Sequence, residues 1–308
     1  MLPRTVLLLI GLQMASVTAA AEAPDAPLTF ICPGQTALAR ALAVRGVFAA
    51  PPAINALIVN VIDGKLAQAR QQLDGMDPAD NARWRQSALI IAAYARDPAM
   101  VAGLLDDGAL VDGQGALPGL DSKFREKLLA EVKKDPKWDT VNPDRQTARD
   151  LDALFLFDGQ LDGPAATIAA QCGDLATLDV ALSHHANGKA RAPHSKDVMV
   201  MAVMANNPVI VNRLLDHGVD PSYAIGNSSD GLIAAIAEGN ASMVTLLLDH
   251  GADPCAEYRS RQQRLDTYAA EHHKQKKALP SDAEIGHRKG LPNDLVARLT
   301  CPALDSGH

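Results

Sequence analysis

Two stretches of this 308-residue sequence align with one another without a gap, and together they decide the fold. The first, DVMVMAVMANNPVIVNRLLDHGVDP, spans Asp197–Pro221, and the second, DGLIAAIAEGNASMVTLLLDHGADP, spans Asp230–Pro254. Each pair of equivalent positions is separated by the same number of residues as Gly218 and Gly251. A fixed period of this size is the signature of an array of stacked repeats.

Each copy predicts a helix, a turn, a second helix and a second turn. Residues 198–205 and 231–238 are small and apolar, so they predict a first helix that neighbouring units can pack against. In the second helix, Val and Leu recur at spacings of three and four, which gives a single apolar stripe that must be buried. Gly218 and Gly251 follow this helix, where a left-handed glycine ends it.

The run LLLDHGADP, Leu246–Pro254, resembles the most characteristic stretch of the ankyrin repeat, and the offset between the two copies equals the ankyrin period. The family's Thr-Pro-Leu-His opening is missing, although Leu232 and Ala235 match its core positions. The resemblance implies an all-α ankyrin-repeat solenoid of stacked helix-turn-helix units. It also implies a concave surface that binds another protein.

Weaker copies extend the array towards the N-terminus, at residues 165–185, 87–108 and 55–78. About 44 residues more than one period separate the first two of these copies. We interpret this excess as a helical excursion from the array rather than a degenerate repeat with a lengthened loop. The predicted organisation is a signal peptide (1–21), an N-terminal cap (22–53), ankyrin-like repeats 1–2 (54–112), a helical insertion (113–158), ankyrin repeats 3–5 (159–255) and a C-terminal cap (256–308).

The first residues predict export. Arg4 precedes a short apolar run over residues 5–12, and Ala19–Ala21 supply a cleavage site of small residues, so we expect cleavage after Ala21. A membrane anchor is the alternative, but the run is shorter than the roughly 20 residues that a spanning helix needs. The expected location is therefore the periplasm or the medium, with no membrane span after signal cleavage.

The C-terminal part loses the repeat pattern. Residues 259–277 predict a charged helix that includes a decayed first helix, and residues 294–299 predict a short amphipathic one. In an oxidising compartment the four cysteines permit two disulfides. Cys255 ends the last good unit and Cys301 lies in the cap, so we expect a bond between them. Cys32 and Cys172 are then either paired or free.

No residue pattern indicates catalysis, a cofactor or a metal. The formal net charge of −7 argues against nucleic acid as a partner, because phosphate binding needs a basic surface. His217 and His250 occupy equivalent places before a terminating glycine, where a cation favours the helix C-terminus. No G-x-S-x-G motif or glycine-rich phosphate loop occurs. We therefore expect a protein that is not an enzyme.

Candidate partner-binding residues lie in the loop before the last repeat and in the insertion. They are Tyr223, Asn227, Ser228 and Asp230 in the loop, and Lys123, Arg125 and Trp138 in the insertion. Trp138 is either a binding anchor, as exposed tryptophans often are, or a packing residue of the insertion. The leading hypothesis is an exported adaptor or inhibitor of another protein. The alternatives are a periplasmic immunity protein against an envelope-targeting toxin and a cysteine-dependent protein that protects against oxidative stress.

Overall fold

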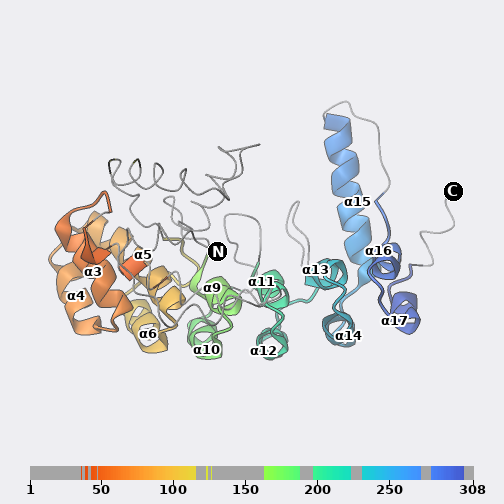
Figure 1. Ribbon diagram of the computed structural model, residues 1–308, viewed down its shortest axis with the longest axis horizontal. Coiled ribbons are helices and arrows are strands. Elements are labelled where there is room, and N and C mark those ends of the chain that lie inside the picture. The colour runs from red at the N-terminus through yellow and green to blue at the C-terminus, as the bar shows by residue number, and fades with distance from the viewer. Residues whose placement is uncertain are drawn as a thin grey trace, which may run out of the picture. The chain divides into compact units, whose positions relative to one another are not determined.

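The regular elements of the described chain are all α-helices. The computed structural model describes residues 36, 39–40, 43–46, 48–115, 123, 126, 163–187, 197–222, 231–271 and 279–301. These residues fall into two units, which divide after Ala186 (Figure 1). Residues 36, 39–40 and 43–44 are helical and lie within the predicted N-terminal cap.

The described residues of the first unit form three helix pairs. Their bounds are α3 (Pro52–Ile62), α4 (Leu66–Asp74), α5 (Pro78–Ala95), α6 (Pro98–Asp106), α9 (Ala165–Gln171) and α10 (Leu175–Ser183). Each first helix contacts the second helix of its own pair, and the first helices α3, α5 and α9 contact one another in that order. Adjacent pairs therefore stack through their first helices, as the repeat pattern predicts.

The described residues of the second unit form three pairs and one additional helix. Their bounds are α11 (Val198–Met204), α12 (Pro208–Asp216), α13 (Gly231–Ala237), α14 (Ala241–Asp249), α15 (Pro254–Glu271), α16 (Asp282–Arg288) and α17 (Asn293–Arg298). Helix α13 contacts α11 on one side and α16 on the other. The sequence predicts the first helix of the final pair within residues 259–277. In the structure, α16 takes that position instead. Helix α15 belongs to none of these pairs, and its C-terminal end projects away from them (Figure 1).

Left-handed residues end the helices at the positions that the repeat predicts. Gly218 and Gly251 have φ of 76° and 90°, a backbone conformation that costs a glycine little. After the first helices the left-handed residue recurs at Gly173, Asn206 and Gly239, each one repeat period after the last. Asn206 replaces glycine here because asparagine tolerates this conformation better than most residues do.

The core consists of small first helices and one stripe of each second helix. Every residue of α9 up to Ala170 is buried, and the many alanines let neighbouring helices approach closely. In α12 the buried stripe includes Val211 and Leu214, and in α14 it includes Val244 and Leu247. Burying one such side chain contributes about 1.5–3 kcal/mol, so packing between pairs holds these short helices together.

Candidate protein-binding surface

The segments that join each second helix to the next first helix differ greatly in length. Residues 75–77 form a short connection, residues 184–197 and 217–230 two longer ones of equal length, and residues 107–164 and 250–281 the longest. We call the segments 107–164, 217–230 and 250–281 the loop edge. By contrast, the second helices α4, α6, α10, α12 and α14 all have the same length. Insertions of this kind collect on one face of a repeat array, which is often its binding face.

Most of the predicted partner-binding residues lie outside the described part of the chain. These are Tyr223, Asn227, Ser228 and Asp230 in segment 217–230, and Arg125 and Trp138 in segment 107–164. Lys123 is described, helical and exposed. The structure therefore does not test whether these residues lie together, and their role in binding stays a prediction.

The beginning of segment 107–164 is held against α5. The Gln86 side chain donates from Nε2 to the Leu110 carbonyl at 3.0 Å, and its Oε1 accepts from the Leu110 amide at 2.9 Å. Further along this segment, Gly115 lies where there is no room for a side chain, because a Cβ on it would lie 2.8 Å from the Cα of Ser87. The described beginning of this segment, up to Gly115, is therefore fixed against α5. Sequence reasoning missed Gln86, since no local pattern marks it.

The beginnings of the two loop-edge segments in the second unit are hydrogen-bonded to each other. Asp220 Oδ1 accepts from the Ser222 amide at 2.9 Å, and Ser222 Oγ accepts from the Asp253 amide at 2.8 Å. Asp253 Oδ1 in turn accepts from the Cys255 amide at 2.9 Å, at the start of α15. The Asp-Pro turns of the repeat thus link one loop to the next.

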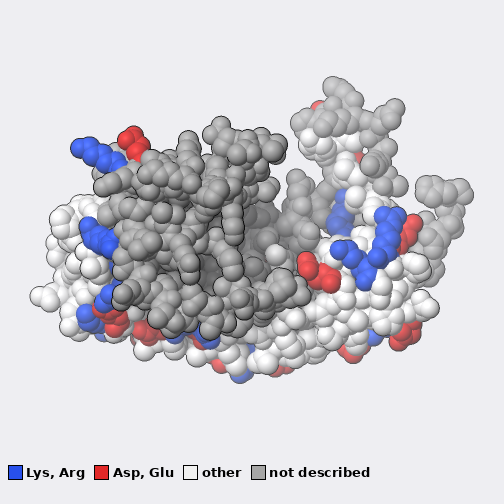
Figure 2. All heavy atoms as spheres, in the orientation of Figure 1, with Lys and Arg blue, Asp and Glu red and all other residues white. Residues whose placement is uncertain are grey.

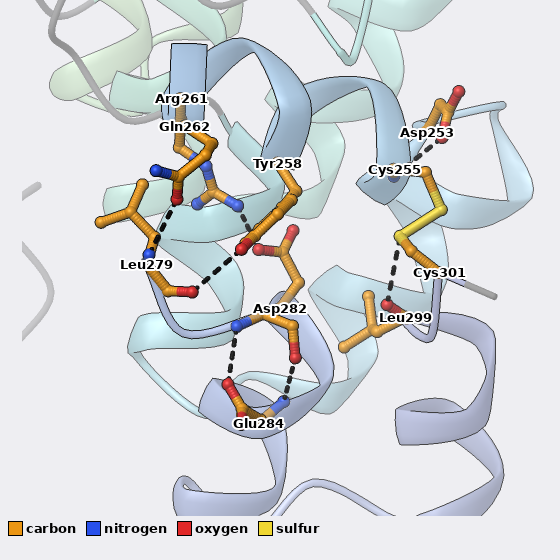
Figure 3. A network of polar contacts seen from close by, with 11 residues as sticks. Asp253, Cys255, Tyr258, Arg261, Gln262, Leu279, Asp282, Glu284, Leu299 and Cys301 are labelled. Carbon is orange, nitrogen blue, oxygen red and sulfur yellow. Dashed lines mark hydrogen bonds and ion pairs between the residues drawn. A yellow bond between two sulfur atoms is a disulfide. The ribbon is translucent and has the colours of Figure 1, made fainter. Parts of the chain in front are cut away.

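A network of polar contacts joins α15 to the last helix pair (Figure 3). The Arg261 guanidinium pairs with the Asp282 carboxylate, and their side chains are only 14% and 1% exposed. Tyr258 Oη donates to the Leu279 carbonyl at 3.0 Å, and the Leu279 amide donates to Gln262 Oε1 at 2.8 Å. Breaking a charged pair buried in this way is costly, because either partner alone would be left buried without its counter-charge.

Cys255 and Cys301 lie beside this network. The structure joins their sulfur atoms, with the Cα atoms 5.4 Å apart (Figure 3). This is the pair that the sequence predicts, and formation of the bond in solution stays a prediction. Cys172 is fully buried and also disulfide-bonded, while Cys32 lies outside the described residues.

Ion pairs shift the pKa values of several charged side chains in the first unit. Hydrogen bonds from Arg40 are the main reason that the pKa of Asp63 falls to about 2, and Lys65 adds to this effect. The bond from Arg70 to Asp107 at 2.6 Å raises the pKa of that arginine in the same way. Each arginine–aspartate pair joins a helical arginine to an aspartate that follows α3 or α6, and neither resembles an acid and base pair for catalysis.

Basic side chains gather over α15 and α16 on the face shown in Figure 2. The exposed residues Arg288 and Lys289 lie at the C-terminal end of α16, where positive charge complements the helix dipole. Their position is therefore explained by helix stability. We assign them no ligand.

The described residues include a cavity and no cluster of metal ligands. No group of three or more His, Cys, Asp or Glu among them could hold a metal ion. A cavity of about 410 Å³ opens beside α3, and its described lining is mostly Ala and Val, with Asn55 and Asn60 as polar residues and no titratable group. Over the described ranges, no helix combines the length and apolar character needed to cross a membrane.

Comparison with known proteins identifies the repeats. A family model of ankyrin repeats in three copies matches residues 166–258, and no curated protein matches the chain. Two similar solved structures are the ankyrin repeat domain of Bcl-3, a unique member of the IkappaB protein family, and the human ASB11 ankyrin repeat domain. The first is 16% identical with a TM-score of 0.45, the second is 14% identical with a TM-score of 0.41, and each match covers 82% of this chain and 99% of the other. Residues 166–258 are ankyrin repeats, and the chain has the all-α ankyrin-repeat fold, a class of module that binds other proteins.

Proposed function

We propose that this chain is an exported, non-catalytic binding protein that acts as an adaptor or inhibitor of one partner protein. The partner binds the loop edge. The observation that carries the proposal is the contrast between the second helices α4, α6, α10, α12 and α14, which share one length, and the long loop-edge segments at 107–164 and 250–281. Variable segments that connect regular helices are typical of a binding surface carried by rigid elements.

The fixed beginnings of these segments support the proposal. Gln86 holds the beginning of segment 107–164, and the network around Arg261 and Asp282 holds α15. Fixing a binding element in advance reduces the entropy that association must overcome. The loop edge is therefore anchored where it meets the array.

Export is proposed from the signal-like segment 1–21 and from the cysteines. Structural disulfides persist in oxidising compartments, and the close approach of Cys255 to Cys301, with Cα atoms 5.4 Å apart, suits such a bond. The immunity protein against an envelope-targeting toxin is one concrete form of the inhibitor. The alternative of oxidative-stress protection requires at least one titratable thiol in the native protein, and no described residue supports it.

The test is capture of a partner from the envelope fraction by the mature protein, which begins at Glu22, followed by light scattering on the isolated complex. A variant that lacks residues 116–158 keeps the turn that Gln86 holds, and Trp138→Ala changes one residue of the intact chain. We expect one partner in fixed stoichiometry, lost with the deletion and weakened by Trp138→Ala.

The matched control is Trp84→Phe, which alters the other tryptophan of the chain at a buried position of α5. It should retain the partner, provided that circular dichroism shows the same helix content. Failure of the intact protein to retain any protein, together with titratable thiols in its native state, would overturn the proposal and favour the redox alternative.

A further inference from the structure

The last helix pair is attached to the array unlike the pair that precedes it in the second unit. The connection from α12 to α13 runs over residues 217–230, whereas the connection from α14 to α16 runs over residues 250–281 and is more than twice as long. The entropy cost of closing a connection grows with its length. The pair α16 and α17, which we call the cap pair, therefore docks on α13 with a weaker tether than the preceding pair has.

The packing of the cap pair is modest. Its helices have seven and six residues, well below the roughly 12–15 residues at which an isolated helix becomes marginally stable in water. Three buried leucines, Leu291, Leu295 and Leu299, form its core. Leu291 and Leu299 close around Gly286, where a Cβ would lie 3.0 Å from Leu291 Cδ1. The cap pair thus has only a small apolar core of its own.

The Cys255–Cys301 bond would provide the short covalent link that the long connection over residues 250–281 does not. Cys301 lies shortly after the end of α17, and Cys255 lies shortly after the end of α14. The bond therefore joins the end of the cap pair to the end of the preceding pair, across a sequence separation of 46 residues. In the chain-entropy model, closing a loop of this length favours the closed state by roughly 10³-fold.

We infer that the cap pair is a redox-dependent cap, which stays docked on α13 while Cys255 and Cys301 are bonded and opens when a dithiol reduces them. Cys255 is half-buried and Cys301 is 7% exposed, so the incoming thiolate attacks Sγ of Cys255. Cys301 leaves as a thiolate and takes up a proton. The second thiol of the dithiol then displaces Cys255, which becomes a thiol, and the dithiol becomes a disulfide.

Opening has two consequences for the surface. It uncovers the side of α13 that α16 packs against, and it releases α15 from the network around Arg261 and Asp282. Because α15 belongs to the loop edge, binding that uses it becomes sensitive to the redox state. This last consequence rests on the proposed function, whereas the opening itself does not.

The test is hydrogen exchange of the full mature chain carrying Cys32→Ala and Cys172→Ala, so that one disulfide remains, before and after reduction by dithiothreitol. The matched control adds Cys255→Ala and Cys301→Ala, which should exchange like the reduced protein under both conditions. We expect exchange in α16 and α17 to accelerate about 10²- to 10³-fold on reduction while α11 and α12 stay unchanged. Alkylation followed by mass measurement counts the two released thiols.

Equal exchange in both states would overturn the inference, and so would simultaneous unfolding of the whole second unit. Resistance of the bond to dithiothreitol in the folded protein would overturn it as well. Partner capture by the reduced protein separates the two proposals. A captured partner with an unresponsive cap pair leaves the proposed function standing and rejects the redox-dependent cap.

Discussion

Removing Arg261 while keeping Asp282 should destabilise the C-terminal end of the array severely. The Asp282 side chain is 1% exposed and the Arg261 side chain 14% exposed, so Arg261→Met leaves a carboxylate buried without its cation. Losing one partner of a buried ion pair costs about 3–5 kcal/mol. Asp282 is the first residue of α16, where the helix dipole favours an anion by about 0.3–1 kcal/mol, so we expect the lower end of that range.

The assay is native-state hydrogen exchange of α16 and α17, which should accelerate by at least about two orders of magnitude. Two variants make the result specific. Arg261→Met with Asp282→Leu removes both charges and should restore most of the protection. Arg298→Met removes an exposed pair with Asp249, whose side chains are 42% and 59% exposed, and should cost at most about 1 kcal/mol. If Arg261→Met costs no more than Arg298→Met, the reasoning about burial is wrong.

Three further predictions concern the array itself. Asp63→Asn should lower the free energy of unfolding by about 1 kcal/mol or less, because the Arg40 side chain is 46% exposed. Since the pKa of Asp63 is lowered to about 2, the stabilisation by its carboxylate is present above about pH 4 and is lost as the pH falls through 2. In a pH series of thermal unfolding, the variant and the parent should therefore differ only above that range. Gln86→Ala should leave global unfolding within about 1–2 kcal/mol of the parent but accelerate amide exchange at Leu110, and unchanged exchange there would show that the turn does not depend on this side chain. Gly239→Ala should lower the free energy of unfolding, measured in urea, by about 1 kcal/mol or more. The φ angle there is +68°, and a Cβ would lie 3.1 Å from a backbone oxygen that follows α16. A neutral effect would contradict this packing.

The repeat could be predicted because its signals are local. The constant repeat offset places α11 at residues 198–204 and α13 at residues 231–237, within one residue of the ranges expected for them. The glycines after the second helices are left-handed as expected, since only the backbone conformation at one residue is at issue. The repeat period and the helix-ending residues were therefore sufficient to predict the fold.

The cap pair could not be recognised from the period, because α15 interrupts it. Gly290 follows α16 with φ of 76°, yet it lies much further than one repeat period beyond Gly239. One local signal was available: Ser281 and Glu284 form a capping box, which marks the start of α16. The apolar pattern of α16 is too weak to identify it as a first helix.

The contacts that fix the loop edge depend on tertiary structure, and the sequence alone does not show them. Arg261 and Asp282 are 21 residues apart, and Gln86 and Leu110 are 24 residues apart. Nothing in either local sequence links the partners. The predicted pair Cys255 and Cys301 was more accessible, because four cysteines leave few combinations and the repeat boundary places one of them next to the cap.

The most direct test of the central claim, that one partner protein binds the loop edge, is hydrogen exchange of the mature chain with and without its captured partner. Protection is predicted over residues 107–164, 217–230 and 250–281, with the second helices α12 and α14 unchanged. Protection concentrated on α12 and α14, with exchange along the loop edge unaltered, would contradict the account.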